Sequence, residues 1–436
     1  MNFTNHICRS GKAVVQNVRP PCRIQQRLYS IANARPFKAG DSVLLRRTDD
    51  RLAPPIFVPR LVPGSKIDSH KGVIPHDNII GRGVRELVPT ERSQRAKTTP
   101  VSDGKSKNAT CLWRLHQVKL DDYVRLTRRL VTPLYPQDAA LVVNLMDLHV
   151  DPPTPLSPAE STNSGGAKLE ILEAGTGHGA LTLYLSRAIH AANSPFHPRG
   201  ETTAEELAEW KASRNAVIHS IEISPKHSAH ANKVVAGFQH GLYVNNVDFH
   251  VSSVGDWVSS ALALHNGQPF LSRAFLDLPG SDSFLSDVTK ALRTDAMLIV
   301  FNPSISQIMD CYERVKAEGM ELDLERVVEL GVNGGSGGRE WDVRAVKPRS
   351  SLKKIGTNTT PSGLDTDADG SESSDEAASL SSGDAFIPSS AREHDGSPID
   401  ETWKMICRPK VGDMVVGGGF LAVFRKQRNS SYQSDS

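Results

Sequence analysis

The stretch KLEILEAGTGHGALTLYLSR, residues 168–187, constrains the fold of this chain more than any other. A short apolar run with strand propensity comes first, and apolar residues at helical spacing come last. Between them lie three alternate glycines, Gly175, Gly177 and Gly179. They permit a sharp turn and let a ligand approach the backbone, where a Cβ would obstruct it. A strand that turns into a helix brings N–H groups to the carboxyl edge of a parallel sheet, so we expect a ligand there.

Strands alternate with helices along the rest of this region. AVIHSIEIS, VDFHVSSV, SRAFLDLPG and DAMLIVFNP read as the following strands, and amphipathic helices separate several of them. REWDVRAV (339–346) and GGFLAVFRK (418–426) are predicted to add two more strands to the same sheet. This alternation is typical of a doubly wound, mostly parallel α/β sheet.

The segments outside this sheet suggest several further units. Short strands and turn glycines over 37–90 predict a small β domain, and 91–112 reads as a polar linker. Two helices precede the central strand, the second starting just after Pro136 with Gln137 or Asp138 near its cap. The larger domain is expected over 113–347, with its last strands in 403–427. Residues 194–213 read as a polar insertion, and we expect an acidic disordered insertion over 348–402 and a disordered tail over 428–436.

The first 40 residues carry seven Lys or Arg residues and no acid; the first acid is Asp41. Such a leader over 1–36 is typical of a mitochondrial transit peptide, and Arg27 lies two residues before Tyr29, as at a matrix-peptidase site. A disordered basic tail is the alternative interpretation. We therefore expect a mitochondrial matrix protein, with the nucleus as the alternative location.

Composition excludes several classes of protein. The 436-residue chain has a net charge of +2, which does not by itself indicate a nucleic-acid partner. No apolar run approaches the roughly 20 residues of a membrane span, so no membrane partner is expected. The five cysteines lie far apart without metal-ligand spacing, which predicts reduced thiols and no metal site.

The glycine turn alone fits two kinds of cofactor. Gly175-x-Gly177-x-x-Ala180 satisfies a loose dinucleotide fingerprint, but a methyltransferase that uses S-adenosylmethionine is the competing interpretation. Glu222 could bind the ribose of either ligand. Glu173 before the turn and the Asp277-Leu278-Pro279 strand end favour the methyltransferase, although Asp277 could also be a turn-capping residue.

Five collinear segments resemble the catalytic subunit family of tRNA (adenine-58-N1)-methyltransferase. They are FKAGDSVLLR with LVPGSKIDSHKGVIPHDNIIG, LYPQDAALVVNLMDL, LEILEAGTGHGALTLYLSRA, FLDLPG, and REWDVRAV with RPKVGDMVVGGGFLAVFRK. The resemblance implies a Rossmann-like class I S-adenosylmethionine-dependent methyltransferase with a small N-terminal β domain, of mitochondrial and fungus-like character. It also implies the formation of N1-methyladenosine in the T-loop of tRNA.

The turn and the resemblance together give a set of candidate site residues. Asp277 is expected at the methyl acceptor as the catalytic residue. The candidate cofactor contacts are Leu134, Glu173, Gly175, Gly177, His178, Gly179, Ala180, Glu222, His227, Ser253, Val254 and Asp277. The chain departs from the family at Ser253, where Asp is usual, at His227, which aligns with an Arg, and at Gly417-Gly418, which replaces His-Thr.

The resemblance also implies the partners. A basic run is the candidate RNA contact, comprising Arg114, Lys119, Arg125, Arg128 and Arg129, although a solvated helix face would look the same. The substrate is expected to be tRNA. The family forms tetramers, so we expect a homo-oligomer or a complex with a non-catalytic paralogous subunit. The alternatives are that this chain is itself such a non-catalytic RNA-binding subunit, or that it is a nicotinamide dehydrogenase.

Overall fold

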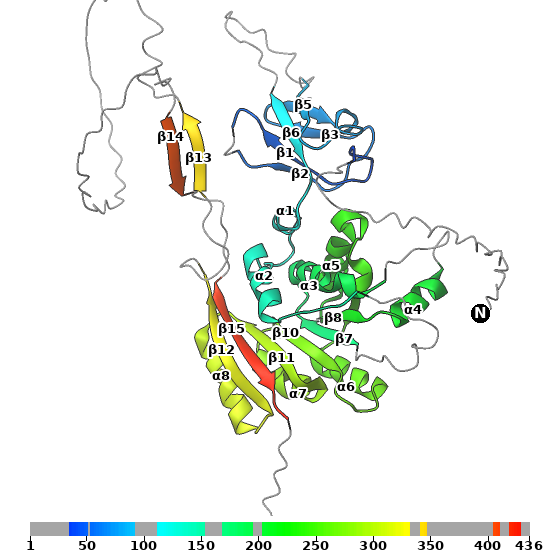
Figure 1. Cartoon of the computed structure of the whole chain (residues 1–436), viewed down its shortest axis with the longest axis vertical. Coiled ribbons are helices and arrows are strands. Elements are labelled where there is room, and N and C mark those ends of the chain that lie inside the picture. Colours follow the sequence, from blue (N-terminus) through cyan, green and yellow to red (C-terminus); the bar gives the residue numbers. More distant parts are fainter. Residues whose placement is uncertain are drawn as a thin grey trace, which may run out of the picture.

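A computed structural model describes residues 35–50, 53–91, 111–152, 168–194, 203–331 and 418–428, and the backbone of two further strands, 341–346 and 404–409. A small β domain lies at one end and a larger α/β domain at the other, with α1 (Leu120–Leu126) between them (Figure 1). The predicted leader, linker, acidic insertion and tail lie largely outside the described residues.

A seven-stranded sheet forms the centre of the larger domain. Its strands lie in the order β12-β15-β11-β10-β7-β8-β9, and all neighbouring pairs except those of β15 are parallel. The bounds are β7 (Leu169–Ala174), β8 (Ala216–Glu222), β9 (Val247–Val251), β10 (Leu271–Leu276), β11 (Leu292–Asn302), β12 (Leu322–Leu330) and β15 (Gly419–Lys426). The chain order reverses between β7 and β10, and ligands of such sheets bind at that point.

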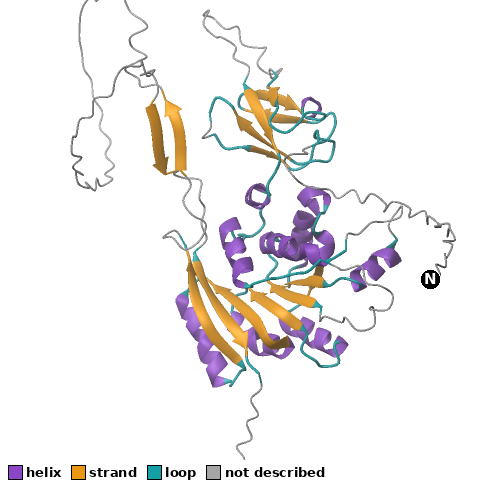
Figure 2. Ribbon diagram, viewed as in Figure 1, coloured by secondary structure: helices purple, strands orange, loops and turns teal. Residues whose placement is uncertain are grey.

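Helices cover both faces of this sheet, as Figure 2 shows. One face packs against α2 (Pro136–Leu145), α3 (Ala180–Ile189) and α5 (Pro225–Gly237). The other packs against α6 (Val254–Leu264), α7 (Leu285–Ala291) and α8 (Ile305–Ala317). Strands such as β7 and β8 are therefore buried on both faces, which explains their nearly continuous apolar sequences.

The N-terminal domain contains a four-stranded antiparallel sheet in the order β2-β1-β6-β5. Its strands are β1 (Val43–Arg47), β2 (Ile56–Val58), β5 (Leu87–Pro89) and β6 (Leu112–His116), beside a hairpin of β3 (Lys66–Ser69) and β4 (Gly72–Pro75). The prediction divided β6 between the linker and the larger domain, and that was wrong. β6 pairs with β1 and β5, partners that lie far away in sequence.

Strand β1 contributes to both domains through its alternating side chains. Val43 and Leu45 are buried in the core of the N-terminal domain. Leu44, between them, points to the opposite face and joins the cluster that contains α2, α3 and α5. One short strand therefore connects the two hydrophobic cores.

The structure also corrects the predicted end of the sheet. The strand expected at 339–346 is β13 (Trp341–Val346), and it pairs with β14 (Lys404–Pro409) in a separate two-stranded sheet. The position beside β15 is taken by β12, which sequence reading missed because charged residues interrupt its apolar pattern. Of the expected last strands in 403–427, only β15 belongs to the central sheet.

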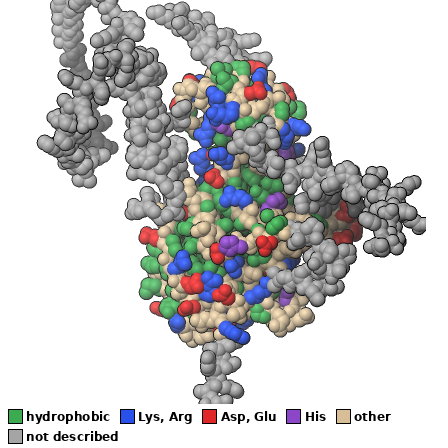
Figure 3. Space-filling view, viewed as in Figure 1, with side chains coloured by type: hydrophobic (Ala, Val, Ile, Leu, Met, Phe, Trp, Pro, Cys, Tyr) green, Lys and Arg blue, Asp and Glu red, His purple; other side chains and the backbone are tan. Residues whose placement is uncertain are grey.

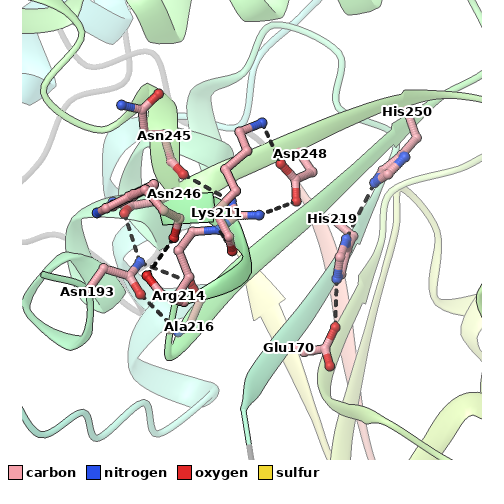
Figure 4. Close-up of polar contacts among 12 residues, drawn as sticks. Glu170, Asn193, Lys211, Arg214, Ala216, His219, Asn245, Asn246, Asp248 and His250 are labelled. Carbon is pink, nitrogen blue, oxygen red and sulfur yellow. Dashed lines mark hydrogen bonds and ion pairs between the residues drawn. The ribbon is translucent and has the colours of Figure 1, made fainter. Parts of the chain in front are cut away.

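A helix occupies part of the predicted polar insertion. Helix α4 (Ala204–Ala212) starts with a capping box, in which Thr203 accepts a hydrogen bond from the Glu206 N–H. Figure 4 shows how its C-terminal end is held: Lys211 and Arg214 both bind Asp248 of β9, and Arg214 also donates to the Asn245 carbonyl. No residue of α4 is buried, so the helix is attached mainly by these polar contacts.

In the part of the chain that the structure describes, no helix is long and apolar enough to cross a membrane.

Candidate active site

A pocket of about 280 Å³, open to solvent, lies where β7 and β10 end. Its lining includes seven predicted site residues, Leu134, Glu173, Gly175, Gly177, His178, Ala180 and Asp277. Sequence reading missed the other five, Thr132, Pro133, Thr176, Leu181 and Phe275. Gly179, Glu222, His227, Ser253 and Val254 do not line this pocket but lie nearby along the chain or the same sheet edge.

The glycine turn brings two strand ends into direct contact. Gly175 has φ +90°, and a Cβ on it would lie 2.1 Å from the Asp277 carbonyl oxygen. The Asp277 N–H also donates to the Ala174 carbonyl at 2.9 Å. Only glycine allows this approach, so the turn fixes the position of Asp277 relative to β7.

Glu173 is a fully buried acid on the wall of the pocket. Its Oε2 accepts hydrogen bonds from Thr182 Oγ1 at 2.7 Å and Ser220 Oγ at 2.8 Å. Burial raises the pKa of Glu173 to about 7, because these hydroxyls only partly replace water and the charge of Asp277 adds repulsion. Ser220 also contacts Thr176 of the turn at 2.7 Å. Glu173 therefore connects the turn to β8 and α3.

Asp277 is the second acid in the pocket, and it is partly buried. Burial raises its pKa to about 6, and no neighbouring cation offsets this effect. The group is therefore mostly ionised at neutral pH but lacks a positive partner among the described residues. Such a carboxylate can receive a donor or a cation from a ligand.

Glu222, at the end of β8, is hydrogen-bonded to the backbone of the glycine turn. Its Oε2 accepts a hydrogen bond from Gly177 N at 3.1 Å and its Oε1 one from Ser224 N, also at 3.1 Å. His227 Nδ1 lies 3.8 Å from Oε1. Two backbone N–H groups therefore orient the carboxylate at the carboxyl edge of the sheet.

Ser253 and Val254 follow β9 along the same edge. Ser253 caps α6 by accepting a hydrogen bond from Asp256 N, and its hydroxyl donates to Asp256 Oδ2 at 2.6 Å. The Ser252 N–H donates to the Glu222 carbonyl, so this segment lies beside the Glu222 strand end. The Asp256 carboxylate therefore lies against the Ser253 hydroxyl at the start of α6.

Residues 127–135, here called the strap, connect α1 to α2 and cover one side of the pocket. Thr132, Pro133 and Leu134 line the pocket, and Val131 Cγ2 would be 3.4 Å from a Cβ on Gly177. The Arg129 guanidinium lies 5.5 Å from the centre of the Tyr135 ring. The strap therefore joins the pocket wall to the predicted basic run.

His178 is 2% exposed, and neither ring nitrogen has a hydrogen-bond partner among the described residues. Burial lowers its pKa to about 4, with His230 and Arg129 acting in the same direction. The imidazole is therefore neutral at physiological pH, and its ring centre lies 5.4 Å from that of His230.

The predicted RNA-contact residues lie on β6, at the start of α1 and within it, and on the strap. Arg128 and Arg129 are exposed, as is Lys119, the residue before α1. Arg125 lies 3.3 Å from Asp122, and Arg114 donates to the Arg85 carbonyl. Within the described ranges, no three His, Cys, Asp or Glu residues are placed to hold a metal ion.

Comparisons with known proteins place this geometry in context. No protein-family model matches the chain. Two curated relatives, from two strains of Thermus thermophilus, are both named tRNA (adenine(58)-N(1))-methyltransferase TrmI. Each is 27% identical to the chain over 293 residues, which cover 67% of this chain and 86% of the relative. The chain is a homologue of these enzymes.

A solved structure supports the fold independently. An S-adenosylmethionine-dependent O-methyltransferase from Thermotoga maritima aligns with a TM-score of 0.51 at 14% identity. The alignment covers 92% of this chain and 97% of that one. The predicted Rossmann-like methyltransferase fold is therefore confirmed.

Proposed function

We propose that this chain is an S-adenosylmethionine-dependent methyltransferase that forms N1-methyladenosine at position 58 of tRNA. The observation that carries the proposal is the pocket at the reversal point of the sheet, where the glycine turn and Asp277 meet. The homology with tRNA (adenine(58)-N(1))-methyltransferases, over most of their length, supplies the substrate and the position of the modified base.

The residues present fit such a cofactor. S-adenosylmethionine carries a positive sulfonium and an ammonium group, and the buried carboxyl group of Glu173 lines the pocket. The backbone of the glycine turn would approach the cofactor closely, and the oriented Glu222 carboxylate would accept hydrogen bonds from its ribose hydroxyls. When bound, the cofactor supplies an electrophilic methyl group.

Asp277 would then position the base. Adenine N1 lies on the Watson–Crick edge, so a paired or stacked base must be turned out of the RNA into the pocket. The Asp277 carboxylate accepts a hydrogen bond from the N6 amino group, which aligns N1 and balances the positive charge that the ring gains on methylation. A base without that amino donor would leave a buried acceptor unpaired, at a cost of about 1–3 kcal/mol.

Replacing Asp277 by Asn tests this role. Turnover of purified protein with tRNA and labelled cofactor should fall by about 10²-fold or more, while cofactor affinity changes little. In the parent enzyme the rate should fall as pH drops through about 6, because the Asp277 carboxylate then takes up a proton. The matched control is Asp282→Asn, because Asp282 pairs with Arg314 outside the pocket.

Three outcomes would contradict the proposal. Near-normal methylation by Asp277→Asn would remove this residue from the mechanism. Nucleoside analysis without N1-methyladenosine, despite tRNA binding by the parent, would indicate a non-catalytic subunit. Tight binding of NAD in place of S-adenosylmethionine would indicate a dehydrogenase.

We infer that tRNA contacts the basic run of Arg114, Lys119, Arg125, Arg128 and Arg129. We also infer that the active form is a tetramer of this chain or a complex with a paralogous subunit. Light scattering of the protein, purified alone and with a candidate subunit, measures the assembly. We also propose mitochondrial import; a fluorescent protein fused to residues 1–36 should reach the matrix.

A further inference from the structure

Four arginines lie at the junction of the two domains, on the N-terminal sheet and on α1. Two of them, Arg114 and Arg125, belong to the predicted basic run. Arg46 of β1 is directly opposite Arg114 of β6 in the antiparallel register, so both side chains project from the same face. Arg85, just before β5, extends a guanidinium nitrogen to within 3.4 Å of His116 Nδ1. We call Arg46, Arg85, Arg114 and Arg125 of α1 the junction cluster. Figure 3 shows Lys and Arg side chains gathered over this end of the molecule.

The junction cluster contains little compensating negative charge. Asp122 is the acid within ion-pair distance, 3.8 Å from Arg46 and 3.3 Å from Arg125. Among the described residues, Arg46 and Arg125 therefore share one carboxylate, and neither Arg85 nor Arg114 has an acid within ion-pair distance. Like charges directly opposite each other in a sheet are destabilising. A polyanion bound on this face would remove that repulsion.

The pKa of His116 reflects the positive electrostatic potential of this face. His116 lies on the same face as Arg114, two residues along β6. Burial lowers its pKa, and Arg85, Arg46 and Arg114 lower it further, with Asp122 acting in the opposite direction. These three arginines thus create a positive field into which a phosphate group would fit.

The junction cluster is continuous with the pocket. Arg129 of the strap donates to the Arg125 carbonyl at 3.2 Å, and the strap then forms the pocket wall at Thr132–Leu134. A ligand that reaches from the N-terminal sheet to the pocket must therefore be long and negatively charged. Folded RNA, recognised through its phosphates and shape, meets both requirements.

We propose that the face of the N-terminal sheet formed by Arg46, Arg85, Arg114 and His116 binds the phosphate backbone of the RNA whose base enters the pocket. This inference rests on the proposed function. It adds Arg46 and Arg85 to the RNA-contact surface and makes the N-terminal domain part of the substrate site.

The experiment compares the parent with the double variant Arg46→Gln/Arg85→Gln. RNA affinity is measured by titration with tRNA at several salt concentrations. The variant should bind about tenfold more weakly at about 0.1 M salt, and the slope of log K against log[salt] should fall by about two. The control is Arg326→Gln, because Arg326 is an exposed arginine on β12 in the other domain. Cofactor affinity should stay unchanged in both variants.

A second readout separates binding from a structural role. In the parent, tRNA should raise the pKa of His116, followed by its ring resonances in NMR, because phosphates neutralise the arginines around it. Unchanged RNA affinity and salt slope in the double variant would overturn the proposal, as would a parent that binds no RNA. A third outcome would separate the two proposals. If the parent binds RNA, the double variant binds it more weakly, and the parent forms no N1-methyladenosine, then the RNA-binding surface is confirmed and the proposed reaction is wrong.

Discussion

Glu173 and Asp277 are acids of the same pocket, but their surroundings suit them to different tasks. Glu173 accepts hydrogen bonds from two hydroxyl groups, those of Thr182 and Ser220. Asp277 lines the pocket and has no such donor among the described residues. Their raised pKa values share one main cause, burial. Without a ligand, the Asp277 carboxylate therefore carries a negative charge that no cation among the described residues neutralises.

This has a consequence for stability that can be measured at Glu173. In an unfolded chain its pKa would be near 4.5, and in the folded protein it is about 7. The folded state binds more protons between these values, so the free energy of unfolding falls as pH rises through this window and is constant above it. One pKa unit is worth about 1.4 kcal/mol, so the loss is on the order of 3 kcal/mol.

Glu173→Gln should abolish this dependence, because Gln stays neutral and its amide oxygen can still accept from Thr182 and Ser220. Urea unfolding at pH 5 and pH 8 should show a large difference for the parent and a much smaller one for the variant. Glu329→Gln, at an exposed position on β12, is the control and should behave as the parent. An equal pH dependence in Glu173→Gln would contradict the assignment.

At the scale of elements, α4 shows how a polar helix can be attached without a hydrophobic face. Arg214 is 6% exposed and binds Asp248. Although burial alone would raise the pKa of Asp248, hydrogen bonds from Arg214 and Lys211 lower it to about 2. The carboxylate therefore stays charged over the whole physiological range.

Asp248→Asn should destabilise the protein by about 3 kcal/mol, because it leaves the Arg214 guanidinium buried without its counter-charge. The loss should appear as a lower unfolding midpoint in urea at neutral pH and as faster hydrogen exchange in α4. Asp287→Asn breaks only the exposed pair with Lys290 and should cost less than about 1 kcal/mol. Equal effects of the two substitutions would show that Asp248 does not anchor α4.

Sequence alone predicted the elements whose signals are local. The apolar runs of β7, β8 and β10 and the glycine turn were identified, and the rule that parallel strand ends meet at one edge brought Glu173 and Asp277 together. Elements defined by distant partners were misplaced. β6 pairs with β1 across the linker, and β12 has an alternating charged sequence whose partner, β15, comes much later. Ser220 and Thr182 were missed, because a hydroxyl that binds a buried acid has no sequence signature.

For the whole molecule, the alternation in β1 implies that the two domains do not unfold separately. Leu44 is 1% exposed within the core of the larger domain, while Val43 and Leu45 belong to the N-terminal core. A cavity created at Leu44 should therefore destabilise the cores of both domains.

Leu44→Ala should cost about 2–5 kcal/mol and speed hydrogen exchange both in β1 and in α3. Leu61→Ala, a buried position of the N-terminal core alone, should speed exchange only in that domain. Mass spectrometry of exchanged peptides distinguishes the two patterns. Unchanged protection of α3 in Leu44→Ala would show that the cores are independent.

The position of β15 sets the timing of folding in the cell. β15 is the last strand of the described residues, yet it lies between β11 and β12 and pairs with both. During translation, β12 is complete at Leu330, long before Gly419 begins the strand that joins it to the sheet. Until then the growing chain carries unpaired strand edges, which favour aggregation and chaperone binding. The central sheet can therefore close only after Gly419–Lys426 has been synthesised, and a ribosome that stops before this segment releases a chain without a complete sheet.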